Sequence, residues 1–145
     1  MPIVGFHLNK VSIEKKKIPE GNMNVDINVN ITNVEEEKDV EIGLAKDRVA
    51  LKYNFDFKID YTPEIATVTF KGHVLAVEDE KTAKEIIKDF KKGTFDEDID
   101  MKLKNFIWVK CTAKAFSLEE DVGLPPHVPL PKLAKQPQQQ QGFVG

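Results

Sequence analysis

The side chains that could carry out chemistry in this sequence are few and stand far apart. The chain holds one cysteine, Cys111, and three histidines, His7, His73 and His127. A nucleophilic thiol needs a neighbouring histidine or cation that lowers its pKa, whereas Cys111 falls within an apolar stripe of a predicted helix. We therefore interpret Cys111 as a small core residue.

The histidines and glycines predict neither a metal site nor a cofactor site. His7 and His73 fall on the polar faces of two predicted strands, where they could be near neighbours, but no cysteine or carboxylate stands at ligand spacing from them. The eight glycines are scattered and form no phosphate-binding loop. We therefore expect no catalytic site, no cofactor and no metal, and we expect that the protein is not an enzyme.

Length and charge restrict the possible partners. The 145 residues carry a net charge of only −3, so the chain is not expected to bind nucleic acid or an acidic membrane. No basic stretch followed by a long apolar run opens the sequence, and no apolar segment reaches the roughly 18 residues of a membrane span. The single cysteine suits a reducing compartment, and together these features predict a cytoplasmic protein.

The elements that must position any site begin with two strictly alternating runs. From Met23 to Ile31 and from Val49 to Tyr61, every second residue is apolar and most residues between are polar. Successive side chains of a strand point to opposite faces, so each run makes one apolar and one polar face. We therefore predict strands over Asn22–Val34 and Arg48–Tyr61, in an antiparallel sheet with one buried face.

Two further strands are predicted, one before and one after this pair in the sequence. In Val4–Ile13 the apolar parity changes between Leu8 and Val11, and a one-residue bulge near Asn9–Lys10 would restore one buried face. Ile65–Val77 keeps small and apolar residues on a single face. Between the second and third strands, the segment Glu35–Lys46 breaks the alternation and predicts a long connection.

Two helices and an extended segment follow. Ala83, Ile86, Ile87 and Phe90 are spaced as on one face of a helix, which is expected to end at Gly93. A longer helix is predicted from about Phe95–Asp98 to Gly123, with an apolar arc wider than one stripe. The order of elements predicts an α+β fold: a four-stranded antiparallel sheet, two C-terminal helices packed on one face, and an extended proline-rich tail. We expect one domain over residues 1–133 and a disordered glutamine-rich tail over residues 134–145.

These elements together resemble the SecB-type protein-export chaperones. The likeness spans Val4–Leu133 and lies in the long strands that lead into Tyr61–Gly72, the second helix with its Trp108, and the proline-rich Leu124–Pro131. The resemblance implies a homotetramer, built as a dimer of dimers, that holds unfolded or preprotein chains in apolar grooves without ATP.

One departure from the family limits what the resemblance implies. Bacterial members are markedly acidic and end in a short tail that contacts the export motor, whereas this chain is mildly acidic and Gln138–Gly145 offers no version of that contact. The resemblance therefore does not imply that this chain binds an export motor. The sequence leaves open whether the protein serves protein export, a toxin–antitoxin pair or the general holding of unfolded chains.

Holding an unfolded client requires exposed apolar area and tolerant geometry. Such area is expected from the long connection, the wide arc of the second helix and the proline-rich segment. The candidate client-binding residues are Val40, Ile42, Leu44, Trp108, Phe116, Leu124, Val128 and Leu130. At about 25 cal/mol per Å² of buried apolar surface, useful affinity needs many such contacts together, which favours an oligomer with a continuous groove.

Each candidate also has an ordinary structural explanation. Trp108 and Phe116 could pack within the protomer or at a subunit interface, and Val40–Leu44 could lead into a strand. A homo-oligomeric scaffold or a dedicated protein-binding module is therefore the alternative function. An enzyme or ligand carrier would need polar groups converging in a pocket, and the buried positions of the second and third strands supply only Tyr53 and Tyr61.

Overall fold

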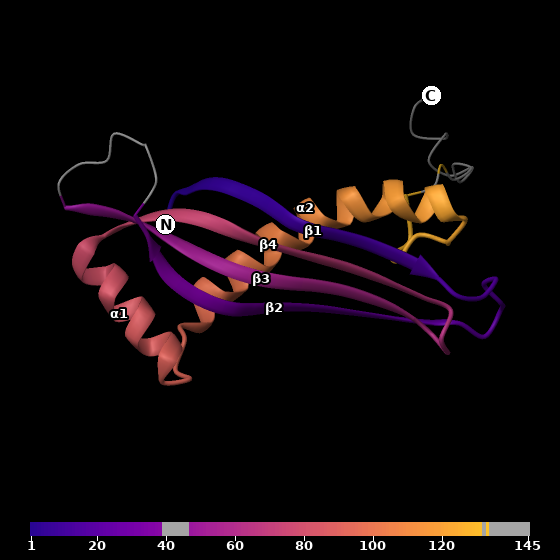
Figure 1. Cartoon of the computed structure of the whole chain (residues 1–145), viewed down its shortest axis with the longest axis horizontal. Coiled ribbons are helices and arrows are strands. Elements are labelled where there is room, and N and C mark those ends of the chain that lie inside the picture. Colours follow the sequence, from indigo (N-terminus) through magenta and orange to yellow (C-terminus); the bar gives the residue numbers. More distant parts are fainter. Residues whose placement is uncertain (39–46, 132, 134–145) are drawn as a thin grey trace, which may run out of the picture.

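The computed structural model describes residues 1–38, 47–131 and 133 (Figure 1). Within them the chain forms four strands followed by two helices: β1 (Ile3–Lys15), β2 (Asn24–Glu37), β3 (Arg48–Thr62), β4 (Ala66–Asp79), α1 (Glu80–Lys91) and α2 (Glu97–Val122). The strands form one antiparallel sheet in the order β1-β4-β3-β2, and both helices pack against it. The predicted α+β fold is confirmed. The predictions for Val40, Ile42 and Leu44 and for the tail over residues 134–145 concern residues outside the described part of the chain.

The alternation predicted for the central strands is what builds the core. On β3, the odd-numbered residues from Leu51 to Tyr61 are buried, and on β4 the even-numbered residues from Ala66 to Ala76 are buried with them. These side chains form one cluster with Leu103, Ile107 and Ala115 of α2. β2 is an edge strand, and its inward side chains from Val25 to Ile31 are only half-buried.

β1 contains the predicted bulge and a second irregularity that was not predicted. Its register against β4 shifts between Leu8 and Lys10, so the bulge expected near Asn9 is confirmed. A second shift between Ile3 and Gly5 was not predicted, and because of it Ile3 packs against the core while Val4 is 46% exposed. In the sequence Val4 shares the parity of Phe6 and Leu8, and the prediction that these three residues face the core together was therefore wrong for Val4.

Gly72 allows β1 to approach β4 closely. A Cβ atom at this position would lie 2.1 Å from the backbone oxygen of His7, far inside a van der Waals contact. A glycine is therefore required here by space rather than by backbone conformation.

β2 continues three residues beyond its expected end at Val34. Glu35 and Glu37 pair with Lys52 and Ala50 of β3, and the Lys52 Nζ atom lies 3.8 Å and 3.9 Å from their carboxylates. A cation on the neighbouring strand thus accommodates an acidic run that, from the sequence, was expected to be part of a connection.

The helices begin and end where the sequence predicts. Asp79 caps α1, because its carboxylate accepts hydrogen bonds from the backbone N–H and the hydroxyl of Thr82. Asp96 caps α2, and Gly123, at φ +74°, ends it in the left-handed conformation. α2 crosses the sheet obliquely (Figure 1) and contacts all four strands.

Candidate functional site

α2 is apolar on more sides than the sheet can cover. Its buried stripe runs at four-residue spacing from Leu103 through Ile107, Cys111 and Ala115 to Glu119. On its outer side Met101 is 59% exposed and Val109 is 65% exposed. A helix with apolar residues around most of its circumference is typical of one that packs on two sides.

Trp108 lies half-buried between the sheet and the proline-rich segment. Its ring centroid is 6.2 Å from that of Phe57 on β3 and 5.9 Å from that of His127. Phe116 lies on the other side of the same histidine, with ring centroids 5.1 Å apart. The two aromatic residues predicted for the groove are thus brought together around His127.

A buried polar network fixes the proline-rich segment against α2 and β3. Glu119 is 1% exposed, and one of its carboxylate oxygens accepts a hydrogen bond from the Tyr61 hydroxyl. The His127 Nδ1 atom is 2.9 Å from both Glu119 oxygens, and its Nε2 atom is 3.1 Å from the Thr112 hydroxyl. The Tyr61 hydroxyl also lies 2.6 Å from the carbonyl oxygen of Pro125. We call Tyr61, Thr112, Glu119 and His127 the latch.

The latch gives each buried polar group a partner, which is what allows a carboxylate to stay in the core. Burial, and then the hydrogen bond to Glu119, raise the pKa of Tyr61 well above its ordinary value. The phenol therefore stays protonated and remains a donor. The result is a rigid link between the sheet, α2 and the segment after Gly123.

An apolar pocket of about 300 Å³ lies beside Glu119 of the latch. Its lining residues are Phe116, Glu119, Glu120, Leu124, Pro126 and Leu130. Leu124 is buried and forms the inner wall, Leu130 is 48% exposed at the surface, and Glu120 is exposed. This volume is at the lower end of the range for small-molecule sites, so it suits one or two apolar side chains.

Of the eight predicted site residues, the structure brings together those of α2 and the proline-rich segment. Phe116, Leu124 and Leu130 line the pocket, Trp108 packs inward beside it, and Val128 is half-buried on the same segment.

Glu119 and the role of His127 were not predicted from the sequence. A signal for Glu119 was present, because it continues the four-residue spacing of the buried stripe on α2. A carboxylate on such a stripe predicts a buried partner, and a histidine eight residues later was the available one.

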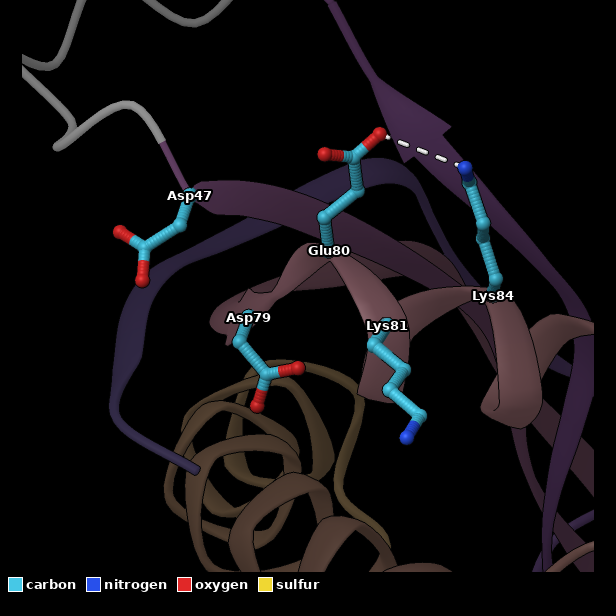
Figure 2. Close-up of a pocket in the computed structure, with 5 residues that line it drawn as sticks. All are labelled: Asp47, Asp79, Glu80, Lys81 and Lys84. Carbon is cyan, nitrogen blue, oxygen red and sulfur yellow. Dashed lines mark ion pairs between the residues drawn. The ribbon is translucent and has the colours of Figure 1, made fainter.

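A larger hollow, of about 620 Å³, is charged and open. It is lined by Asp47, Asp79, Glu80, Lys81 and Lys84 at the start of α1 (Figure 2). Asp79 is engaged as the helix cap, and Glu80 pairs with Lys84 at 3.3 Å. Its polar lining does not suit apolar side chains.

The remaining reactive groups show ordinary structural roles. Burial raises the pKa of the Cys111 thiol to about 12, so the thiol stays protonated. His7 and His73 are cross-strand neighbours with ring centroids 4.9 Å apart, as their strand faces predicted. Among the described residues, no group of three or more histidine, cysteine or acidic residues could hold a metal ion. No helix in the described part of the chain is long and apolar enough to cross a membrane.

Comparison with known proteins identifies the fold. No family model and no curated protein matches the sequence. Among solved structures, the chain is similar to the SecB-like chaperone Rv1957 of Mycobacterium tuberculosis, which was solved in complex with a ChAD peptide from the Rv1956 HigA1 antitoxin. The match has a TM-score of 0.56 at 15% sequence identity and covers 91% of this chain and 88% of that chain. The resemblance inferred from the sequence is thus confirmed at the level of the fold: this chain has the fold of a SecB-like chaperone.

Proposed function

We propose that this protein is an ATP-independent chaperone, a holdase, that binds unfolded polypeptides through apolar surface beside α2. The observation that carries the proposal is the pocket lined by Phe116, Leu124 and Leu130, because it is apolar inside, open to solvent and too small for a folded partner. Trp108, Val128 and the predicted Val40, Ile42 and Leu44 complete the proposed client-binding surface. The peptide-bound state of the M. tuberculosis chaperone supports the proposal.

The proposed clients are extended chains that carry apolar side chains beside neutral or basic ones. Glu120 lies exposed at the pocket and favours a basic neighbour over an acidic one. A single pocket of this size buries little surface, so we propose that several protomers present their pockets along one groove. A homotetramer, arranged as a dimer of dimers in the cytoplasm, would supply this.

A scaffold that closes its own apolar surface is the second candidate function. The exposed Met101 and Val109 on the outer side of α2 favour it, because they would be covered by another copy. A scaffold would consume the apolar surface and leave none for clients.

Light scattering of a chemically denatured model protein, diluted with and without this chain, tests the proposal. We expect suppression of aggregation near stoichiometric amounts. Leu130→Asp should weaken suppression several-fold, because it puts a carboxylate into the pocket. Leu133→Asp is the matched control, since Leu133 is fully exposed and does not line the pocket. A wild-type chain that forms a stable oligomer and suppresses nothing would favour the scaffold.

A further inference from the structure

β2 ends the sheet, so only one of its two edges pairs with a strand. In an antiparallel ladder, every second residue turns its N–H and C=O groups away from its neighbour. Between Asn24 and Ile31 the register with β3 is continuous, and no described residue makes a backbone hydrogen bond to the opposite edge of this stretch. The outer edge of Asn24–Ile31 therefore presents a regular row of donors and acceptors.

This edge carries few of the devices that usually prevent strand pairing, and its one charged residue is Asp26 on the solvent side. Proteins protect edge strands with lysine, proline, bulges or inward-pointing charges. Asn24–Ile31 contains no lysine and no proline, its inward residues are all apolar, and the bulge comes only after Ile31. β1, at the other edge, is interrupted by two register shifts and carries Lys10. The sheet is thus protected on one side and open on the other.

β2 is linked to the latch through Tyr61 on the neighbouring strand. Val25 pairs with Tyr61, whose hydroxyl reaches the carbonyl oxygen of Pro125 in the latched segment. Val25, Ile27, Val29 and Ile31 are half-buried against the core. A strand added beside them would cover their exposed parts and extend the apolar face.

We infer that the outer edge of Asn24–Ile31 receives a segment of the unfolded client as an added fifth strand, an inference that rests on the proposed function. Main-chain hydrogen bonds are the same for every sequence, so this mode of binding tolerates many clients. The apolar side chains of the client face the same side as Ile27 and Val29, and its polar side chains face solvent with Asn28 and Asn30.

A second copy of the chain that paired along the full length of β2 would fit less well than a client does. Symmetric antiparallel pairing over the whole of β2 would bring Asp26 of one copy beside the acidic Glu35–Glu37 end of the other, in both halves of the pair. Like charges facing each other across strands are destabilising. A client with basic residues at its ends meets no such repulsion.

Residue-resolved amide hydrogen exchange on the full chain tests the inference. The probe is a labelled ten-residue peptide of alternating valine and threonine with a lysine at each end, and its binding is followed separately by fluorescence anisotropy. Bound peptide should slow exchange at least tenfold at every second amide of Asn24–Ile31, because only the outward amides gain partners. Of two peptides N-methylated at alternate residues, one should bind at least about tenfold more weakly, since it loses several backbone donors.

Matched variants and alternative outcomes make the test decisive. Ile27→Lys should weaken peptide binding, because it points a charge inward at the edge, whereas Asn28→Ser on the solvent side should leave it unchanged. A peptide that binds without alternating protection, or with both N-methylated forms equal to the parent, would overturn the added strand and leave the holdase proposal standing. A chain that binds no peptide would overturn the holdase proposal itself. Alternating protection already present without peptide, and rising with protein concentration, would assign the edge to a second copy and refute the inference.

Discussion

Removing the carboxylate of the latch should be among the most damaging single changes in this protein. In Glu119→Ala, the Tyr61 hydroxyl keeps the Pro125 carbonyl as an acceptor, so little is lost there. His127 loses both hydrogen bonds to the carboxylate, one from Nδ1 at 2.9 Å and one from its backbone N–H at 3.4 Å. Its Nδ1 atom is left buried without a partner, and a cavity replaces the Glu119 side chain.

These losses set the expected magnitude. Leaving a buried hydrogen-bonding group without its partner costs about 1–3 kcal/mol in free energy of unfolding. Because Glu119→Ala removes the acceptor of two His127 donors and opens a cavity, a loss of about 3 kcal/mol or more is expected. Glu119→Gln keeps the shape and one acceptor, and it should cost about 1–3 kcal/mol. The double variant Glu119→Leu, His127→Leu should lose less than the two single changes added together, because each single change leaves the other group unpaired.

Urea unfolding followed by tryptophan fluorescence measures both stability and the state of the latch. Trp108 is the single tryptophan, and its ring lies 5.9 Å from that of His127, so release of the segment should shift its emission to longer wavelength. Glu120→Ala is the control, since Glu120 is exposed and should change stability by less than about 0.5 kcal/mol. If Glu119→Ala costs no more than this control, or if the single costs simply add, the latch is not the link described here.

Two further predictions concern the core and the sheet. Burial raises the pKa values of Tyr53 and Tyr61 above the ordinary 10.0, with Glu78 and Glu119 adding to the respective shifts, so the folded state favours the neutral phenols. The stability that these neutral phenols contribute is complete below pH 10 and is lost as the pH rises above 10 toward the raised pKa values. Tyr61→Phe should therefore flatten the decline of the urea midpoint with pH. An unchanged slope would contradict the raised pKa of Tyr61. Gly72→Ala should lower stability by about 3 kcal/mol or more, because the added Cβ meets the His7 backbone. Gly21→Ala is the control, since nothing lies within 4 Å of a Cβ at that position. Equal melting temperatures for the two variants would contradict this prediction.

Much of the fold could be predicted because its strands are long and each has one buried face. Over Val49–Tyr61 the period of two is typical of a strand and not of a helix. In the first strand, the change of apolar parity between Leu8 and Val11 predicted the bulge that the register shows. The end of β2 was predicted less well, because Glu35–Glu37 is polar and unlike a strand taken alone. Lys52 on β3 lies near both carboxylates and accommodates the acidic end of the strand.

The candidate site was predictable in outline only. Phe116, Leu124 and Leu130 could be selected as surplus apolar residues, and the structure gathers them into one pocket. The inward packing of Trp108 depends on His127, which is 19 positions away and is placed by Glu119. Such a contact depends on where α2 ends and how the chain returns, and periodicity carries no information on either.

The latch also determines when during synthesis the pocket can exist. Tyr61 and Glu119 are 58 positions apart, and Tyr61 and Pro125 are 64 apart. A nascent chain that has completed all four strands and α1 therefore still lacks α2 and the outer wall at Leu130, while the apolar face of its sheet is uncovered. Until those residues emerge, the growing chain exposes apolar surface of the kind found on the unfolded polypeptides it is proposed to hold.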